Sequence, residues 1–413
     1  MSLTVKTLGM LFGGDCLALA GGRKLFVSGA LPGEELEVEI TKSFKDYDAA
    51  RIIRVIAPSP HRAEPFCPLY GVCGGCNFQH IDGGHQIELR KTLLRESFGL
   101  EGAECPEIEV ISASGRGYRS RIQLTDGGFS RRDSNEIVPL SECPVASREI
   151  NSYLGSVPQD SRPRGRVHVF GDRRVSLAQG KVIVAEEDGG ASGEIRLLGG
   201  VSPEKMRGLR LQRSRHFAGT PPSPRNRCEI ILAGRRIAFD ARGFFQSNLE
   251  VLEKTVPALT CGIGGKNLLD MYSGCGTLSV FMADFFDRVT FVEHNRDALV
   301  FAGENLSGRE HESFGMSGER WIRLHADKVA AAHGDFDAVV IDPPRSGMEP
   351  AVRQWLCGSK IPLIRSLSCN PRSHARDAAA LLRSGYSLTR LCLLDFYPNT
   401  SHIESLASFE YTG

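Results

Sequence analysis

The 413-residue sequence has no uninterrupted apolar run near the roughly 18 residues that a membrane-spanning helix requires. Its first residues, MSLTVKTLGM, lack the charged segment followed by an apolar segment that marks an export signal. We also find no internal repeat and no long low-complexity segment. These absences argue against membrane, secreted and repeat proteins, so we expect a cytoplasmic protein with no membrane partner.

The net charge is also small, at +1, and it argues neither for nor against a nucleic-acid partner. The average hides an excess in the middle of the chain, because residues 116–240 contain 22 Lys plus Arg and only 14 Asp plus Glu. This section is either a phosphate-binding surface or an ordinary solvated basic face. Its arginines form two clusters: Arg162, Arg164, Arg166, Arg173 and Arg174, then Arg207, Arg210, Arg213 and Arg215.

A chain of this length exceeds the usual size of one hydrophobic core, so we expect two or three domains. Residues 1–57 alternate apolar and polar positions between glycine turns, which predicts a small antiparallel β-barrel or sheet; such barrels often bind oligonucleotides. Residues 58–240 hold a cysteine cluster and short strands, which predicts a central α+β domain. Residues 241–413 alternate strands and helices, as a doubly wound α/β domain requires.

The cysteine cluster is a loop with the spacing C-x5-C-x2-C, formed by Cys67, Cys73 and Cys76. A fourth ligand would come from elsewhere, and Cys143 and Cys105 both precede a proline in a turn-like setting. Four thiolates suit a [4Fe-4S] cluster or structural zinc, whereas unligated structural cysteines are the simplest alternative. Zinc usually takes two C-x2-C pairs and the loop has one, so the cluster is the favoured interpretation.

The segment NLLDMYSGCGTL, from Asn267 to Leu278, predicts a buried strand, a glycine turn that begins at Gly274, and a helix from Leu278 to Phe286. Glycines let a ligand approach the main chain at the carboxyl end of a strand, where open α/β sheets bind ligands. The next predicted strand ends in Glu293, whose carboxylate could accept hydrogen bonds from two ribose hydroxyls. The turn lacks a phosphate-binding pattern, which favours a nucleoside without phosphates.

A further strand, from Phe336, ends in the motif Asp342-Pro-Pro-Arg345 at the same edge of the predicted sheet. The prolines stiffen the turn that presents Asp342. Methyltransferases that act on amino nitrogens often carry an aromatic residue after the second proline. Arg345 occupies that position, which points away from amino-nitrogen chemistry.

Cys369 follows another predicted strand and precedes a helix that we expect to begin near Ser373. A helix N-terminus favours the thiolate form, although a lone cysteine is more often a small core residue. Carbon 5 of uracil is a poor nucleophile, so its methylation needs a thiolate that adds to carbon 6 and a base that later removes the carbon 5 proton. Glu404 is the candidate base and His402 a weaker one; Glu404 could also be an ordinary surface acid.

Together these motifs resemble the RNA 5-methyluridine (uracil-C5) methyltransferase family, in particular its ribosomal-RNA branch with an N-terminal TRAM domain and an iron-sulfur cluster. The motifs that carry the resemblance, in the order of the family, are GALPGE, CPLYGVCGGCNFQH, GFFQSN, DMYSGCGTL, DPPRSGM, SCNP and HIE. The resemblance covers nearly the whole chain. The short arginine-rich middle region and the barrel, which is not basic, depart from the family, and they bear on the choice of RNA.

The resemblance implies a Rossmann-like class I methyltransferase domain in residues 241–413, a TRAM-like barrel in residues 1–57 and an iron-sulfur, RNA-binding domain in residues 58–240. It implies S-adenosylmethionine as the methyl donor and a uridine of RNA, most readily 23S ribosomal RNA and alternatively transfer RNA, as the substrate. The implied roles are as follows: Cys67, Cys73, Cys76 and Cys143 hold a [4Fe-4S] cluster; Cys369 is the nucleophile and Glu404 the base; Gln246, Tyr272, Gly274, Glu293 and Asp342 bind the donor, with Asp327 on its adenine side.

Two rivals remain. A 5-methylcytosine enzyme would carry a cysteine after the proline of the fourth-strand motif, where this chain has Pro344-Arg345. A non-catalytic iron-sulfur RNA-binding protein would have no need of both Cys369 and Glu404. Arg119, Arg121 and Arg132 are predicted to hold the RNA backbone. The sequence gives no indication of the oligomeric state.

Overall fold

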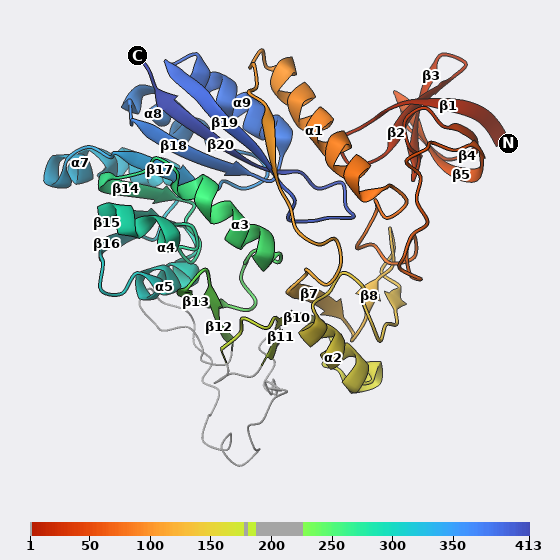
Figure 1. Ribbon diagram of the computed structural model, residues 1–413, viewed down its shortest axis with the longest axis horizontal. Coiled ribbons are helices and arrows are strands. Elements are labelled where there is room, and N and C mark those ends of the chain that lie inside the picture. The colour runs from red at the N-terminus through yellow and green to blue at the C-terminus, as the bar shows by residue number, and fades with distance from the viewer. Residues whose placement is uncertain (1, 177–180, 187–225) are drawn as a thin grey trace. The chain divides into compact units, whose positions relative to one another are not determined.

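The computed structural model describes residues 2–176, 181–186 and 226–413, which form two compact units (Figure 1). The first unit consists of Met1–Ser97, Ser130–Val138 and Tyr397–Ile403. The second unit consists of Phe98–Phe129, Pro139–Phe396 and Glu404–Gly413. Within the described ranges, every helix is too short or too polar to cross a membrane. The predicted division into three domains stays a prediction.

The predicted N-terminal barrel is confirmed. Its strands are β1 Ser2–Met10, β2 Cys16–Ala20, β3 Arg23–Ser28, β4 Glu35–Ser43 and β5 Tyr47–Ala57, closed in the order β1-β2-β3-β5-β4. Alternate side chains such as Leu25 and Val27 of β3 face the interior, as the period of two requires. The β3–β5 pair is parallel, although we predicted an antiparallel barrel. A closed ring of five strands cannot alternate direction throughout, so at least one pair must be parallel.

The first unit continues from the barrel through a buried ion pair into a loop and a helix. Glu34 is fully buried and accepts hydrogen bonds from the Arg62 guanidinium, with both N–O distances 2.6 Å. The amides of Leu31 and Ser59 donate to the same carboxylate, so its charge is well compensated. The helix α1 Gly83–Leu100 follows, and β8 Phe129–Ser130 and β9 Ile137–Val138 form a small two-stranded sheet.

The second unit is built on an eight-stranded sheet of order β16-β15-β14-β17-β18-β20-β19-β6. The strands are β6 Ile108–Ile111, β14 Gly265–Met271, β15 Phe286–Val292, β16 Glu310–Phe314, β17 Ala338–Ile341, β18 Leu363–Ser368, β19 Tyr386–Leu394 and β20 Glu404–Tyr411. The five strands from β16 to β18 in this order are parallel, so their carboxyl ends share one edge. β20 runs antiparallel to β18. The predicted α/β fold is therefore confirmed.

Helices connect these strands (Figure 1). They are α3 Leu249–Thr260, α4 Ser279–Met282, α5 Arg296–Asn305, α6 Gly318–Trp321, α7 Asp327–His333, α8 Pro350–Ser359 and α9 Pro371–Leu382. The helix predicted from Leu278 to Phe286 is wrong in length, because α4 ends at Met282, a 3-10 turn follows, and Phe286 already begins β15. Phe286 could belong to either element, and its pairing with Gly265 of β14 decides for the strand.

A smaller strand-rich part of the second unit lies between residues 116 and 240. It contains β7 Arg121–Thr125, β10 Arg166–Gly171, β11 Val182–Glu186, β12 Arg227–Leu232, β13 Arg235–Asp240 and the helix α2 Arg148–Ser156. β7, β10 and β11 form one sheet, and β12 and β13 form a hairpin.

Two arginines of the basic section hold this part together. Arg162 is buried and donates to four main-chain carbonyls, those of Gly127, Leu140, Leu154 and Val157, at 2.6 to 3.0 Å. Arg174 forms ion pairs with Asp172 and Glu253. These two side chains are therefore structural and not part of a phosphate-binding face. The arginines at 207, 210, 213 and 215 lie outside the described residues.

We expect Arg162→Met to lower the free energy of unfolding by about 4 kcal/mol, because four carbonyls lose their donor and each unsatisfied group costs about 1 kcal/mol. Urea unfolding followed by circular dichroism measures the change. Arg164→Met is the matched control, since Arg164 is exposed and its replacement should change stability by less than about 0.5 kcal/mol. Equal destabilisation by the two variants would contradict the structural role of Arg162.

Candidate active site at the carboxyl edge of the large sheet

The glycine turn after β14 leaves open space beside the main chain. Tyr272, Gly274 and Gly276 all have left-handed backbone angles, with φ of 62°, 54° and 74°. A Cβ added at Gly276 would lie 3.2 Å from the Ala302 Cβ, so this glycine permits close packing on α5. A Cβ added at Gly274 would meet nothing within 4 Å. Gly274 is therefore the point at which a ligand can approach the turn.

Polar atoms surround this turn. Glu293, just after β15, accepts hydrogen bonds from the amides of Gly274 at 3.0 Å and Asn295 at 2.7 Å, which fixes its carboxylate. The Gln246 Oε1 and Ser273 Oγ atoms are buried, and neither has a hydrogen-bond partner among the described residues. Buried polar atoms normally have partners, so these two fit a bound polar molecule. Gly274 and Glu293 thus fit the predicted nucleoside site, and the place of Gln246 in it stays a prediction.

Tyr272 is oriented by a residue that the sequence analysis did not single out. Its hydroxyl donates to Glu349 at 3.3 Å, and the same carboxylate accepts from the amide of Glu319 at 2.9 Å. Burial and the nearby Glu349 carboxylate raise the pKa of Tyr272, so it stays a neutral donor. Glu349 immediately precedes α8. In the sequence it cannot be distinguished from any other acid at the start of a helix.

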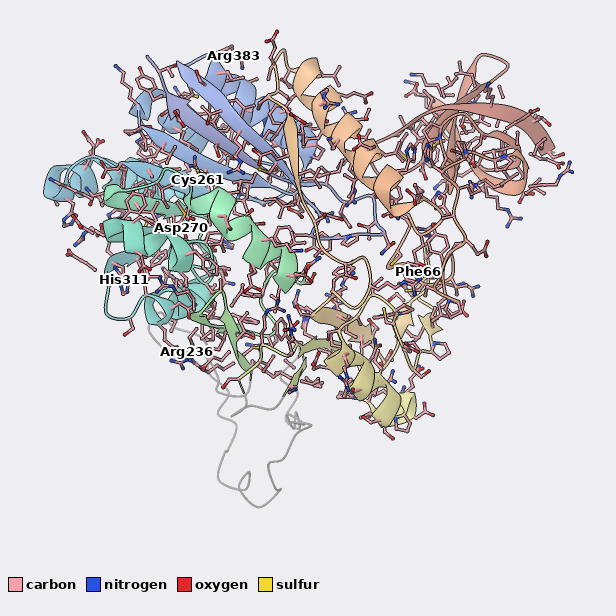
Figure 2. The ribbon with its side chains drawn as sticks, viewed as in Figure 1. Phe66, Arg236, Cys261, Asp270, His311 and Arg383 are labelled. Atoms are coloured by element: carbon pink, nitrogen blue, oxygen red, sulfur yellow. The ribbon has the colours of Figure 1, made fainter. Side chains whose placement is uncertain are left out.

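Two further acids are buried at the ends of neighbouring strands. Asp270 on β14, labelled in Figure 2, accepts from the Ser279 hydroxyl at 2.5 Å. Burial, and then the charges of Asp342 and Glu293, raise the pKa of Asp270 to about 7. Burial raises the pKa of Asp342, which follows β17, to about 6. A cation bound at this edge would favour the charged forms of both.

The pairing of β18 with β20 brings Cys369 and Glu404 together. Ser368, the last residue of β18, pairs with Ser405, the second residue of β20. Cys369 is the next residue along the first strand, and Glu404 precedes Ser405 on the antiparallel strand, so the two occupy the following rung. Cys369 is half-buried, and Glu404 is the charged group with the largest effect on its pKa. The predicted pair of thiol and carboxyl is thus placed at one point.

The prediction that a helix N-terminus lowers the pKa of Cys369 is wrong for this structure. The pKa of Cys369 is raised to about 11. Burial is the largest cause, the charges of Glu404 and Asp342 also raise it, and the charge of Arg345 lowers it by less. Burial and the charge of Asp342 likewise raise the pKa of Glu404 to about 8. Sequence could not reveal these effects, because they come from residues far apart in the chain.

Helix α9 fixes the loop that carries Asp342 and Arg345. It begins at Pro371, earlier than predicted, with Asn370 as the N-cap. The Arg345 carbonyl accepts hydrogen bonds from the Asn370 side chain at 2.9 Å and from the Ser373 hydroxyl at 3.1 Å. The Arg345 guanidinium is exposed and lowers the pKa of both Cys369 and Glu404. Sequence analysis used Arg345 only to exclude another chemistry and missed this effect.

Two predicted residues, Asp327 and His402, have no contact among the described residues that supports their roles. Asp327 is exposed in the first turn of α7, twelve residues beyond Gly315, which follows β16, and in the described ranges we find no hydrogen bond or ion pair that joins it to the other predicted residues. His402 is exposed, with its ring 5.5 Å from that of Tyr397. Neither residue gains support for its predicted role.

The cysteine loop belongs to the first unit, and Phe66, labelled in Figure 2, immediately precedes it. The amides of Tyr70 and Cys73 donate to the carbonyls of Cys67 and Leu69, which folds the loop tightly. The Gly75 amide donates to the Cys73 sulfur at 3.4 Å. Cys143 belongs to the second unit. Within the described residues no three His, Cys, Asp or Glu side chains are arranged to hold a metal ion.

The arginines predicted to hold RNA already have contacts within the protein. Arg121 bonds to His168 at 3.0 Å and donates to the Arg242 carbonyl at 3.1 Å. Arg119 donates to the Arg121 carbonyl, and Arg132 donates to the Cys76 carbonyl. The structure does not test their predicted contact with RNA, so this role stays a prediction.

Comparison with known proteins gives three kinds of match. The family model described as tRNA (Uracil-5-)-methyltransferase matches residues 229–410. An RNA methyltransferase of Treponema denticola, named as uncharacterized, is 34% identical, with 98% of each chain covered. The 23S rRNA (uracil(1939)-C(5))-methyltransferase RlmD of Halomonas elongata is 31% identical, with 94% of this chain and 85% of that protein covered.

A solved structure matches the fold over the same length. It is the Pyrococcus abyssi tRNA (uracil-54, C5)-methyltransferase in complex with S-adenosyl-L-homocysteine, with a TM-score of 0.69, 22% identity, and coverage of 98% of this chain and 100% of that one. At this identity the likeness establishes the fold, including the barrel that precedes the α/β part.

Arg345→Gln should raise the pKa of the Cys369 thiol above about 11, because the variant loses the cation that opposes two carboxylates. At pH 9 only a small fraction of the thiol is ionised, so alkylation of Cys369 by iodoacetamide should slow by about threefold. Peptide mapping by mass spectrometry measures this single cysteine. Added salt should reduce the difference, since Arg345 is exposed.

The matched control is Arg383→Gln, which removes the same charge just beyond the far end of α9 (Figure 2). It should leave the alkylation rate unchanged. Equal rates for the two variants would show that Arg345 does not act on Cys369.

Proposed function

Because the chain belongs to the RNA uracil-C5 methyltransferase family and is an RNA (uracil-5-)-methyltransferase, we propose that it methylates carbon 5 of a uridine through a covalent bond to Cys369. The observation that carries this proposal is the β18–β20 register, which brings Cys369 beside Glu404 at the edge that also presents Asp342 and the glycine turn. The target base must leave its stack to reach this edge.

S-adenosylmethionine supplies the methyl group as a sulfonium. Gln246, Tyr272, Gly274 and Glu293 bind the donor, and the open space at Gly274 and the unpartnered Gln246 Oε1 atom support this assignment. The positive donor would offset the carboxyls of Asp342 and Asp270, whose pKa values burial raises.

Cys369 and Glu404 divide the chemistry. The Cys369 thiol gives up its proton to water, the sulfur bonds to carbon 6, and the electron pair of the 5,6 double bond moves towards oxygen 4, so carbon 5 gains nucleophilic character. After methylation Glu404 takes the proton from carbon 5, the 5,6 double bond forms again, and the carbon–sulfur electrons return to Cys369. The raised pKa values of both groups mean that a neutral thiol and a carboxyl with a pKa of about 8 rest side by side before RNA binds.

The substrate is proposed to be 23S ribosomal RNA. Support comes from the relatives named for that RNA, which match this chain at 28 to 31% identity over more than nine-tenths of its length. Transfer RNA is the alternative, since the family model carries that name. Mapping 5-methyluridine in both RNAs from cells with and without the gene separates the two, because the methyl group disappears from one of them only.

Cys369→Ala should abolish turnover and keep donor binding, because the thiol acts on RNA and lies outside the glycine turn. Glu404→Gln should form the carbon–sulfur bond and then stall, since an amide cannot take the carbon 5 proton. Denaturing gels with labelled RNA should therefore show a covalent complex with Glu404→Gln and none with Cys369→Ala. Release of methylated RNA by Glu404→Gln at the normal rate would exclude Glu404 as the base.

A [4Fe-4S] cluster held by Cys67, Cys73, Cys76 and Cys143 is a further part of the proposal. Soft thiolates are the usual ligands of such clusters. Hydrogen bonds from main-chain amides to the ligand sulfurs are common around clusters, and the Gly75 amide donates one to the Cys73 sulfur. The three loop cysteines are half-buried and close together in sequence on a tightly folded loop. The cluster would order the loop.

Anaerobic reconstitution should load about four iron and four sulfide ions per chain. Cys73→Ser and Cys143→Ser should each lose most of the iron, because each removes a proposed ligand. Cys105→Ser is the matched control and should retain iron, since Cys105 is the rejected alternative for the fourth position. Iron loss with Cys105→Ser but not with Cys143→Ser would reverse that assignment, and zinc in place of iron would exclude the cluster.

A further inference from the structure

A buried histidine lies behind the reactive pair and has no part in the chemistry proposed above. His374 is in the first turn of α9 and is 2% exposed. Its Nδ1 atom bonds to the Ser405 hydroxyl at 2.7 Å. The Nε2 atom is buried without a hydrogen-bond partner in the described part of the chain, and the Phe98 ring packs edge-on at 5.7 Å.

Ser405 occupies a special place on β20. It directly follows Glu404, and it pairs with Ser368, which directly precedes Cys369. Side chains alternate along a strand, so Ser405 faces α9 and the Glu404 side chain faces the opposite side of the sheet. The Ser368 hydroxyl bonds to the Asn370 main chain at 3.1 and 3.2 Å. The polar pair Ser368 and Ser405 is therefore adjacent, along the two strands, to the pair Cys369 and Glu404.

Core packing alone does not account for an imidazole at this position. Burying a polar ring with one of its two nitrogens unsatisfied costs free energy that an apolar side chain of similar size would avoid. Burial also holds the pKa of His374 down to about 4, so the ring is neutral and its charge plays no part. What His374 provides that an apolar residue cannot is a directed bond to the start of β20.

We propose that His374 is a positioning residue for proton abstraction, which through Ser405 fixes the first residue of β20 and so holds the Glu404 carboxylate in reach of the carbon 5 proton. This inference rests on the proposed role of Glu404. Formation of the sulfur–carbon bond depends on β18 and on the loop that α9 fixes, whereas proton removal depends on β20. Loss of the His374–Ser405 bond should thus slow the second step and spare the first.

The test compares Ser405→Ala with Ser408→Ala. Both serines are buried on β20, and the Ser408 hydroxyl has no hydrogen-bond partner in the described ranges. The readouts are kcat, KM for RNA, the fraction of enzyme bound covalently to RNA at steady state, and the isotope effect on kcat with RNA that carries deuterium at carbon 5. Ser405→Ala should lower kcat by about tenfold with KM nearly unchanged, because a misplaced catalytic group costs rate.

Ser405→Ala should also accumulate the covalent complex and show a deuterium isotope effect that Ser408→Ala lacks. A merely structural contact would lower thermal stability and move neither readout. His374→Asn, which retains a short polar group near the Nδ1 position, should restore most of kcat, whereas His374→Leu should behave as Ser405→Ala does. These two variants answer the question even if Ser405→Ala folds poorly.

Glu404→Gln serves as the reference in the same experiment. If it traps the covalent complex and Ser405→Ala behaves as Ser408→Ala does, the positioning role of His374 is overturned and the function stands. If Glu404→Gln itself traps no complex, the proposed role of Glu404 falls, and with it the inference about His374.

Discussion

The antiparallel pairing of β18 with β20 is the constraint on which the site depends. Parallel strands β14, β15 and β17 deliver Asp270, Glu293 and Asp342 to one edge of the sheet, as any doubly wound fold does. β20 enters from the opposite direction, so its first residue, Glu404, arrives at the same edge as the end of β18. One reversed strand thereby adds a carboxyl group beside Cys369.

Electrostatics at this edge are unfavourable in the resting protein. Burial raises the pKa values of Asp270, Asp342 and Glu404 to about 7, 6 and 8, and the charge of Asp342 adds to the rise for Asp270 and Glu404. The same effects raise the pKa of Cys369 to about 11. Such an excess of acids is suited to a cationic donor. The positive charge of Arg345 opposes these acids at Cys369 and Glu404. The Cys369 thiol is thus neutral near pH 7.

Much of this arrangement could be predicted from sequence. Glycines and strand-end acids are local signals, so the turn at Gly274 and the positions of Glu293, Asp342 and Glu404 follow from short segments. The five-stranded barrel was likewise readable from period-two alternation and glycine turns. These features depend on neighbours in the chain, which the sequence displays directly.

The remainder depends on contacts between distant segments. Burial, and then the charges of Glu404 and Asp342, raise the pKa of Cys369, whereas the following helix alone led to a prediction of a lowered pKa. Arg162 belonged to an arginine cluster in the sequence, yet it is buried against four carbonyls. Asp327 was placed by resemblance, and the structure leaves it exposed on α7. His374 gave no local signal at all.

The most direct measurement of the central claim uses RNA in which the target uridine is replaced by 5-fluorouridine. Fluorine at carbon 5 leaves Glu404 no proton to remove, so the sulfur–carbon bond should persist after methyl transfer. Mass spectrometry of the digested complex should then find the methylated nucleotide attached to Cys369. Attachment to a different residue, or no covalent complex with enzyme that methylates ordinary RNA, would contradict the account.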